Sequence, residues 1–404
     1  MRKIVIQKKR IKFNLLLVGA FIAFILFDEL YFRGRELYIT PIFGLFLLLF
    51  DDQKIKINTG VVWIVLLSIY TSLIGVKLSE NAENFSLLYN IVSFLNILNI
   101  YLLFLKYSEY FFDILKNTLY LTTIVTSLFI FLSELPILRY RWADYLKGHI
   151  GYRLGLSSNI NPNTIAWLFG ILGMLTLFLY IHEHHRRYLL LIVLQVIFIL
   201  LSGSKAGLLF MLIPILYYGI KSLFTLNIKI TILIILAIGI LWFSIQHNPL
   251  LYTLVGKRID EMLLTLGIGR DIAGVSVDAT STLKRIDMLE TAWKMFTEKP
   301  IFGWGIGAFA KFGGYGYYSH NNFLELLVSG GIVGFIIYYG YLLLLSITIF
   351  LKEKSKMKDM LLILIISLIL SDMITVTFYS RIVFYFRTIL ILIVLSLNTD
   401  LEKS

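Results

Sequence analysis

A guanidinium and an imidazole lie on either side of a glycine-rich stretch in the last third of the chain. Arg285 belongs to a polar segment that ends at Pro300, and His320 comes just before an apolar run. A guanidinium binds phosphate oxygens through a bidentate fork, and a neutral imidazole can accept the proton of a hydroxyl group. Arg285 is expected near the start of a helix, whose N-terminus together with the guanidinium would suit a diphosphate, and His320 could serve as a base. The alternative for Arg285 is a surface ion pair with Asp287 or Glu290.

The residues that follow His320 predict a capped helix start. Asn322 is the expected N-cap, and Glu325, three residues later, is expected to complete a capping box. The positive end of the helix dipole disfavours a charged imidazole, so we expect His320 to be neutral. The alternative is an interfacial histidine that only hydrogen-bonds the turn.

Alternating glycines fill the stretch between these residues. The two sets are Gly303, Gly305 and Gly307, then Gly313, Gly314 and Gly316. The first set is similar to a phosphate-binding turn, but no strand precedes it, as a dinucleotide-binding fingerprint requires. The alternative is a tight turn whose backbone comes close to other helices. The tyrosines of the second set could stack on sugar rings or lie at the level of lipid headgroups.

Further cations lie upstream, near the ends of apolar runs. Arg141 and Arg153 belong to a segment rich in tyrosine and tryptophan. In the following Asn161-Pro162-Asn163, Asn161 can N-cap a helix that begins with proline. Lys205 lies in the tight turn 202–207 and would place one cation at the membrane surface.

Apolar runs surround all of these residues. Of the 404 residues, 58% are hydrophobic, more than a soluble core requires. The runs cover residues 13–27, 37–50, 61–76, 87–105, 111–132, 160–181, 188–201, 204–220, 228–245, 321–350, 359–378 and 382–398. We therefore expect an all-α, polytopic integral membrane protein with about twelve transmembrane helices. The runs 37–50 and 188–201 are the shortest and could be re-entrant.

The distribution of charge predicts an orientation. A basic N-terminus precedes the first run, and Asp28-Glu29 stands where a cleavable signal would have small residues, so this helix is expected to stay in place. Short basic connections alternate with short connections poor in cations, which places both termini in the cytoplasm. We expect one integral membrane domain, 1–404, and one large extracytoplasmic loop, 246–320. Cations in a long outer loop suggest an anionic ligand there.

That loop is expected to contain a helical lid. Residues 283–296 have helical periodicity, with Ile286, Leu289, Trp293 and Phe296 turned toward the bilayer or the protein.

The amino-acid composition excludes or disfavours several classes of function. There is no cysteine, so disulfides and thiolate chemistry are excluded. The net charge of +12 arises from bases that flank apolar runs, which is typical of membrane proteins and not of nucleic-acid binding. His182, His184 and His185 lack the spacing of a zinc motif, so we expect neither a metal nor a cofactor.

Taken in order, these motifs resemble the O-antigen polymerase and O-antigen ligase superfamily of membrane glycosyltransferases. The resemblance covers about 150–345 and rests on Arg153-x-Gly155 with Asn161-Pro-Asn163, Ser202-Gly-Ser204-Lys205-Ala-Gly207, Arg285 leading to Pro300-Ile-Phe-Gly303-Trp-Gly305-Ile-Gly307, and His320-Asn321-x-x-Leu-Glu325 with Gly330-Gly331-x-x-Gly334. One departure is Lys205, where the family usually has arginine; lysine is a point charge without the bidentate fork. The spacing of Gly330 and Gly334 also suits close helix packing.

The resemblance implies a donor glycan on polyprenyl diphosphate at the outer face of the cytoplasmic membrane. It assigns Arg153, Lys205 and Arg285 to the diphosphate and His320 to the acceptor hydroxyl as base of an inverting, metal-independent displacement. Asn161, Asn163, Arg141, Asn321 and Glu325 are candidate residues for binding the diphosphate or glycan. Membrane lipid surrounds such an enzyme, and a chain-length regulator and a flippase of the same pathway are possible partners.

Three functions follow from this reading. A residue composition rich in lysine, isoleucine and asparagine favours a polymerase of capsule or exopolysaccharide repeat units. The first alternative is ligase-type transfer of the same glycan to another acceptor. The second is a flippase for lipid-linked oligosaccharides; charges gathered in outer loops and not at the middle of the membrane favour an enzyme.

Overall fold

The computed structural model describes most of the chain as helix. The described residues are 2–31, 39–49, 55, 57–76, 87–146, 154–155, 160–204, single positions between 207 and 221, 228–252, 256, 260, 279–351, 356–373, 375–378 and 381–401. Every regular element among them is helical, which confirms the predicted class.

The helices follow the predicted apolar runs to within a few residues at most ends. They are α1 (Arg2–Tyr31), α2 (Thr40–Leu49), α3 (Thr59–Val76), α4 (Leu87–Lys106), the short 3-10 turn η2 (Ser108–Tyr110), α5 (Phe111–Leu146), α6 (Pro162–Glu183), α7 (Arg187–Ser202), α9 (Ile228–His247), α10 (Pro249–Leu251), α12 (Ala279–Glu298), α13 (Ala308–Phe312), α14 (Asn322–Phe350), α15 (Lys356–Asp372) and α16 (Arg381–Leu401).

Two helices extend well beyond their predicted runs: α1 begins at Arg2, before the run 13–27, and α5 continues past the run 111–132. The predicted apolar run 111–132 ends before Ser133, but α5 continues to Leu146 with Pro136 inside it. Apolarity ends near Ser133, whereas the residues beyond it still favour helix, so the helix outlasts the apolar run. Arg141 therefore belongs to α5 and not to a loop.

The chain separates into two compact units. The first comprises Met1–Thr122 and Leu283–Ser404, and the second comprises Thr123–Thr282. In the second unit, α6 and α7 pack closely along their lengths. The first unit contains Arg285, His320, Asn321 and Glu325.

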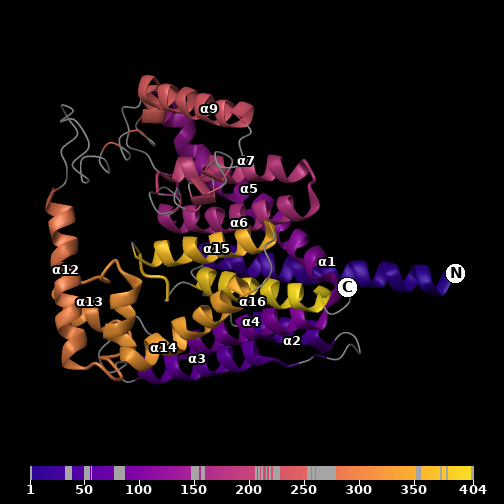
Figure 1. Ribbon diagram of the computed structural model, residues 1–404, viewed down its shortest axis with the longest axis horizontal. Coiled ribbons are helices and arrows are strands. Elements are labelled where there is room, and N and C mark those ends of the chain that lie inside the picture. Colours follow the sequence, from indigo (N-terminus) through magenta and orange to yellow (C-terminus); the bar gives the residue numbers. More distant parts are fainter. Residues whose placement is uncertain are drawn as a thin grey trace. The chain divides into compact units, whose positions relative to one another are not determined.

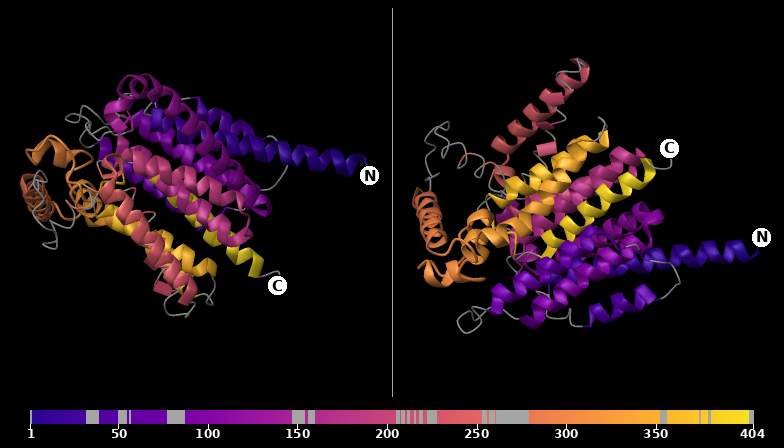
Figure 2. Two further views of the ribbon diagram at one scale, coloured as in Figure 1. Left: turned by 90° about the horizontal axis from the view of Figure 1, so that it is seen from above. Right: turned by 60° about the horizontal axis from the view of Figure 1, so that its bottom comes forward.

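The first unit is a bundle with one helix across its end. Within it α4 packs against α2, α3 and α16, and α14 packs against α3 and α15. Figure 1 and Figure 2 show these helices running side by side, while α12 runs crosswise to α3 and α14 beyond the end of the bundle. The short helix α13 lies between α12 and α14 in the chain and packs against α14.

The bundle presents apolar side chains outward. Ile336, Leu343 and Leu344 on α14 are each 61% exposed, as expected for side chains that face lipid. In the described residues, four stretches are long and apolar enough to cross a membrane, namely Ile11–Asp28, Ser108–Pro136, Pro162–Glu183 and Asn322–Phe350, and shorter apolar helices accompany them. The number of twelve spans stays a prediction.

Candidate functional site

Helix α14 is interrupted one third of the way along its length. Gly331 has φ 63° and ψ −164°, which is outside the helical region and outside the range of most L-residues. In an unbroken helix, the amides of Ile332 and Val333 would bond to the carbonyls of Val328 and Ser329. The break releases two donors and two acceptors inside the protein, and each needs a new partner.

The glycine-rich loop supplies all four partners. The carbonyls of Pro300 and Ile301 accept hydrogen bonds from the two released amides at 2.8 and 3.2 Å. The amides of Trp304 and Gly305 donate to the two released carbonyls at 2.7 and 2.8 Å. The loop is thus attached to the broken helix in the way that two strands of a sheet are attached.

This geometry decides between the two interpretations of the first glycine set. The amides of Gly303, Trp304, Gly305 and Ile306 all donate to protein carbonyls, so the phosphate-binding turn is wrong for these residues. The close-approach interpretation is confirmed. A Cβ at Gly303 would lie 2.6 Å from the Val328 carbonyl oxygen, and Gly303 has φ +65°.

Gly330 and Gly334 of α14 allow α3 to approach closely. A Cβ at Gly334 would lie 2.8 Å from the ring of Tyr70, whose hydroxyl donates to the carbonyl of Gly330. The helix-packing interpretation of Gly330 and Gly334 is therefore confirmed.

Helix α12 is attached to this loop through an apolar core. Its buried residues Met288, Ala292, Met295 and Phe296 pack with Ala308, Phe309 and Val328. Of the predicted apolar face, only Phe296 is buried in the protein, while Ile286 and Trp293 are 49% and 53% exposed. The helix begins at Ala279, so Arg285 lies in its second turn, and the expectation that the helix N-terminus adjoins Arg285 is wrong.

His320 occupies a turn that its neighbours hold firmly. Its φ of 58° is unusual for a residue with a side chain and costs roughly 1–3 kcal/mol. The amide of the buried Ser319 donates to Glu325 Oε2 at 2.8 Å, and the Ser319 hydroxyl donates to the Asn321 carbonyl at 3.1 Å. These bonds stabilise the left-handed conformation. The fully buried Glu325 carboxylate serves to hold the turn.

The cap of α14 lies one residue earlier than predicted. Asn321, and not Asn322, is the N-cap, because its Oδ1 accepts a hydrogen bond from the Leu324 amide at 3.0 Å. Asn322 is fully buried, and partners from elsewhere in the chain occupy its side chain. Glu325 reaches Ser319 instead of completing a capping box.

Tyr317 links the Arg285 segment to His320, because its ring contacts both the imidazole and Lys284, the neighbour of Arg285. Burial of the imidazole and, as the second cause, the positive charge of Arg285 lower the pKa of His320 below its ordinary value. Arg285 itself is exposed, and one partner that the sequence offers it, Asp287, accepts a hydrogen bond from Tyr315. The predicted neutral state of His320 is supported, although by burial and Arg285 and not chiefly by a helix dipole. An exposed guanidinium beside a neutral imidazole can bind an anion and accept a proton.

Tyrosines of the second glycine set line the space between α12 and the His320 turn. The rings of Tyr317 and Tyr318 lie 5.7 and 4.7 Å from the imidazole, both edge to face. Lys284 lies 5.1 Å from the centre of the Tyr317 ring, and their hydrogen bond raises the pKa of the lysine. Tyr317 and Tyr318 therefore support the His320 turn, which accounts for part of the aromatic pattern in this stretch.

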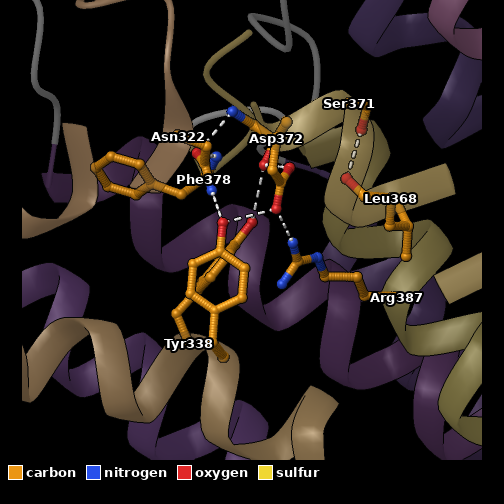
Figure 3. Close-up of polar contacts among 9 residues, drawn as sticks. Asn322, Tyr338, Leu368, Ser371, Asp372, Phe378 and Arg387 are labelled. Carbon is orange, nitrogen blue, oxygen red and sulfur yellow. Dashed lines mark hydrogen bonds and ion pairs between the residues drawn. The ribbon is translucent and has the colours of Figure 1, made fainter. Parts of the chain in front are cut away.

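A buried polar cluster lies on the other side of the α14 start, and the sequence analysis missed it. Figure 3 shows Asp372 of α15 between Arg387 of α16 and the aromatic residues of α14. Arg387 Nη2 lies 2.8 Å from Asp372 Oδ2, and the two side chains are 2% and 0% exposed. We refer to the following residues as the Asp372 cluster: Asn322, Tyr338, Tyr339, Asp372, Thr377 and Arg387.

A signal for this cluster was present in the sequence. Asp372 lies in the predicted run 359–378 and Arg387 in the next run, 382–398. Opposite charges in neighbouring membrane helices, near the connection between them, usually pair.

The remaining predicted residues belong to the second unit. Asn161 is the N-cap of α6, with Pro162 at the first helical position, and its Oδ1 accepts from the Asn163 amide at 2.9 Å, as predicted for the cap. Arg153 and Lys205 lie outside the described residues, as does the side chain of Arg141. Gly203, in the predicted tight turn, ends α7 in a left-handed conformation.

A comparison with protein families identifies the segment that contains these features. Residues 189–339 match the family model described as O-Antigen ligase. No curated protein and no solved structure matches the chain. The match confirms the predicted superfamily over a segment that includes Arg285, His320, Asn321 and Glu325. Together with the apolar helices, it indicates a membrane enzyme that acts on lipid-linked glycans.

Proposed function

We propose that the protein polymerises lipid-linked oligosaccharide repeat units into a surface polysaccharide at the outer face of the cytoplasmic membrane. The observation that carries the proposal is that the Tyr317 ring contacts both His320 and Lys284, the neighbour of Arg285, within the segment that matches the O-antigen ligase family. The donor is a glycan on polyprenyl diphosphate, and the acceptor is a hydroxyl of another glycan.

The reaction is a single inverting displacement. The acceptor oxygen forms a bond to the anomeric carbon of the donor while the bond from that carbon to the diphosphate oxygen breaks. His320 accepts the hydroxyl proton, and polyprenyl diphosphate leaves as an anion. Arg285 stabilises the charge that develops on the diphosphate, which gives electrostatic stabilisation without a metal ion. The lowered pKa of His320 keeps the imidazole neutral before the reaction.

The resemblance also assigns residues of the second unit to the substrate. We assign Arg153 and Lys205 to the diphosphate. The residues proposed to bind the diphosphate or the glycan are Arg141, Asn161, Asn163, Asn321 and Glu325. Replacement of Lys205 by arginine should be tolerated, because it supplies the fork that the family usually has. Arg285→Lys should lose most activity, because the charge remains but the bidentate geometry is lost.

The central experiment uses purified protein in vesicles with a synthetic polyprenyl-diphosphate oligosaccharide. We expect a ladder of longer lipid-linked chains from the unmodified protein and single repeat units from His320→Gln. Glutamine keeps a hydrogen-bond donor and acceptor but cannot take the proton. Normal chain growth in a correctly folded His320→Gln variant would remove His320 from the role of base.

Ligase-type transfer is the second candidate, and the description of the matching family favours it. Both functions use the same donor and the same displacement, so only the acceptor separates them. Vesicles that contain the donor alone should yield long chains with a polymerase. With a ligase, product should form only when a second, non-donor glycan acceptor is added. Movement of intact donor across the bilayer without any transfer would indicate a flippase.

The proposed orientation places both termini in the cytoplasm and residues 246–320 outside. The chain has no cysteine, so single cysteines can be introduced at Ser276 and Ser355 without background. An impermeant thiol reagent added to intact cells should label position 276 and not position 355. The opposite pattern would overturn this orientation.

A further inference from the structure

We propose that the Asp372 cluster positions His320 by fixing the first turn of α14 to α15 and α16. The inference rests on the proposed function, because it concerns the residue to which that function assigns the proton. The residues of the cluster act through Asn321 and Asn322, which directly follow His320 in the chain, so they are positioning residues.

The hydrogen bonds of the cluster all lead to one carboxylate. Asp372 Oδ1 accepts from the Thr377 hydroxyl at 2.5 Å, and Oδ2 accepts from the Tyr339 hydroxyl at 2.7 Å and from Arg387 at 2.8 Å. Thr377 uses its only hydroxyl proton for this bond, so the Tyr338 hydroxyl, 3.2 Å away, is a donor to Thr377. Three donors favour the ionised form of this carboxylate, and Arg387 provides the balancing charge.

A contribution to folding stability does not by itself explain the buried ion pair of Asp372 and Arg387. Removing two charges from water is costly, and well-packed apolar residues are often as stabilising as a buried ion pair. Two atoms of the Arg387 guanidinium, Nε and Nη1, are buried and have no hydrogen-bond partner among the residues that the structure describes. The group lies 4.0 Å from the centre of the Tyr338 ring. The protein accepts this cost in an apolar bundle, where ionisable groups usually serve function.

Asn322 transmits the constraint to the His320 turn. Its Oδ1 accepts from the amides of Thr377 and Phe378, both at 2.8 Å, and its Nδ2 donates to the Tyr339 hydroxyl at 2.6 Å. The side chain of Asn321 adds a bond to the Met373 carbonyl at 3.3 Å. The first turn of α14 is therefore attached to the connection between α15 and α16 (Figure 3).

Two separate supports thus determine where His320 stands relative to Arg285. The glycine-rich loop and α12 hold Arg285 on one side of the turn, and the Asp372 cluster holds the other side. Misplacement of a reacting group by about 1 Å can reduce a rate a hundredfold, so loosening of the second support should be visible in kcat.

The test compares two tyrosines on the same helix. Tyr339→Phe removes the hydroxyl that joins Asn322 to Asp372 and keeps the ring, which stacks on Phe323 at 4.9 Å. Tyr341→Phe is the matched control, because its hydroxyl lies 3.4 Å from Thr59, outside the cluster. We expect kcat to fall by about tenfold to a hundredfold in Tyr339→Phe with an unchanged KM for the donor. The control should behave as the unmodified protein.

Hydrogen exchange gives a readout that does not depend on activity. Amides 319–326 should exchange faster in Tyr339→Phe than in the unmodified protein, and those in Tyr341→Phe should not. In a His320→Gln background, Tyr339→Phe should reduce the residual rate no further, because both changes act on the same proton transfer. Unchanged exchange, or an equal rate loss in both backgrounds, would overturn the inference. Absence of transfer by the unmodified protein would refute the proposed function, while the exchange comparison would still decide whether the cluster holds the turn.

Discussion

Two helices of this protein begin with an asparagine cap, and their surroundings differ. At the start of α6, the Asn161 side chain bonds to the amide of Asn163, two residues away, and Pro162 follows the cap. At the start of α14, Asn321 caps the helix, and the next side chain, Asn322, bonds to residues more than fifty positions along the chain. The first start is specified locally and the second by tertiary contacts.

This difference shows which of the two turns can maintain an unfavourable backbone conformation. A local cap holds one helix end, and that is sufficient for the ordinary backbone at Asn161. The turn before α14 holds His320 at a positive φ, and bonds from Glu325, Ser319 and Asn322 are needed to determine it. Unfavourable backbone conformations persist where the surroundings determine them several times over. We therefore expect chemistry at the α14 start and binding or support at the α6 start.

The largest expected effect comes from replacing His320 and Asn161 in turn and measuring the rate of glycan transfer. His320→Gln should reduce the transfer rate by about a hundred- to ten-thousandfold, the usual range for a general base. Asn161→Ser preserves a capping oxygen, so it should change the rate little at saturating donor, although loss of the proposed substrate contact should raise the KM for the donor. Both are measured as chain growth on the lipid-linked donor. A larger loss from Asn161→Ser than from His320→Gln would reverse the contrast.

The second test removes the long-range support of α14. Asp372→Asn leaves the Arg387 charge buried without its counterion, which should destabilise the protein by about 3–5 kcal/mol. The double change Asp372→Asn with Arg387→Met removes both charges and should recover most of that stability. Thermal unfolding in detergent measures both variants. If the single variant unfolds at the temperature of the unmodified protein, the ion pair does not support the bundle.

The sequence predicts those features of the fold that depend only on residues adjacent in the chain. Most helix bounds follow from apolar runs, and the α6 cap follows from Asn161 and Pro162. The prediction that Asn322 caps α14 is wrong because residues near Thr377 bind its side chain, and no local pattern contains that information. The break at Gly331 is hidden for the same reason, since it depends on the loop that replaces the helical hydrogen bonds.

The third test compares the two caps directly. Asn161→Ala and Asn321→Ala should each cost about 1 kcal/mol of stability, because each leaves a helical amide without its partner. Asn321→Ala should also speed hydrogen exchange around His320, since the bond to the Met373 carbonyl is lost as well. Aspartate at either position retains the capping oxygen and should preserve the stability, but at position 321 it cannot donate to the Met373 carbonyl and should still speed exchange. Equal exchange around His320 in all four variants would show that Asn321 acts only as a local cap.

The smallest effect concerns pH and separates the two causes of the lowered His320 pKa. The neutral imidazole is the active form, so activity should fall as pH decreases through the pKa of His320. Burial and the Arg285 charge lower this pKa, and the acidic limb of kcat/KM should lie below the ordinary histidine value of about 6.5. Arg285→Gln removes the second cause and retains the first, so its normalised limb should move toward higher pH without reaching that value. Arg285→Lys keeps a positive charge beside the imidazole and should leave the limb in place, although both variants lose rate through weaker binding of the diphosphate. A limb that moves equally in the two variants would mean that the guanidinium shape, and not its charge, determines the protonation of His320.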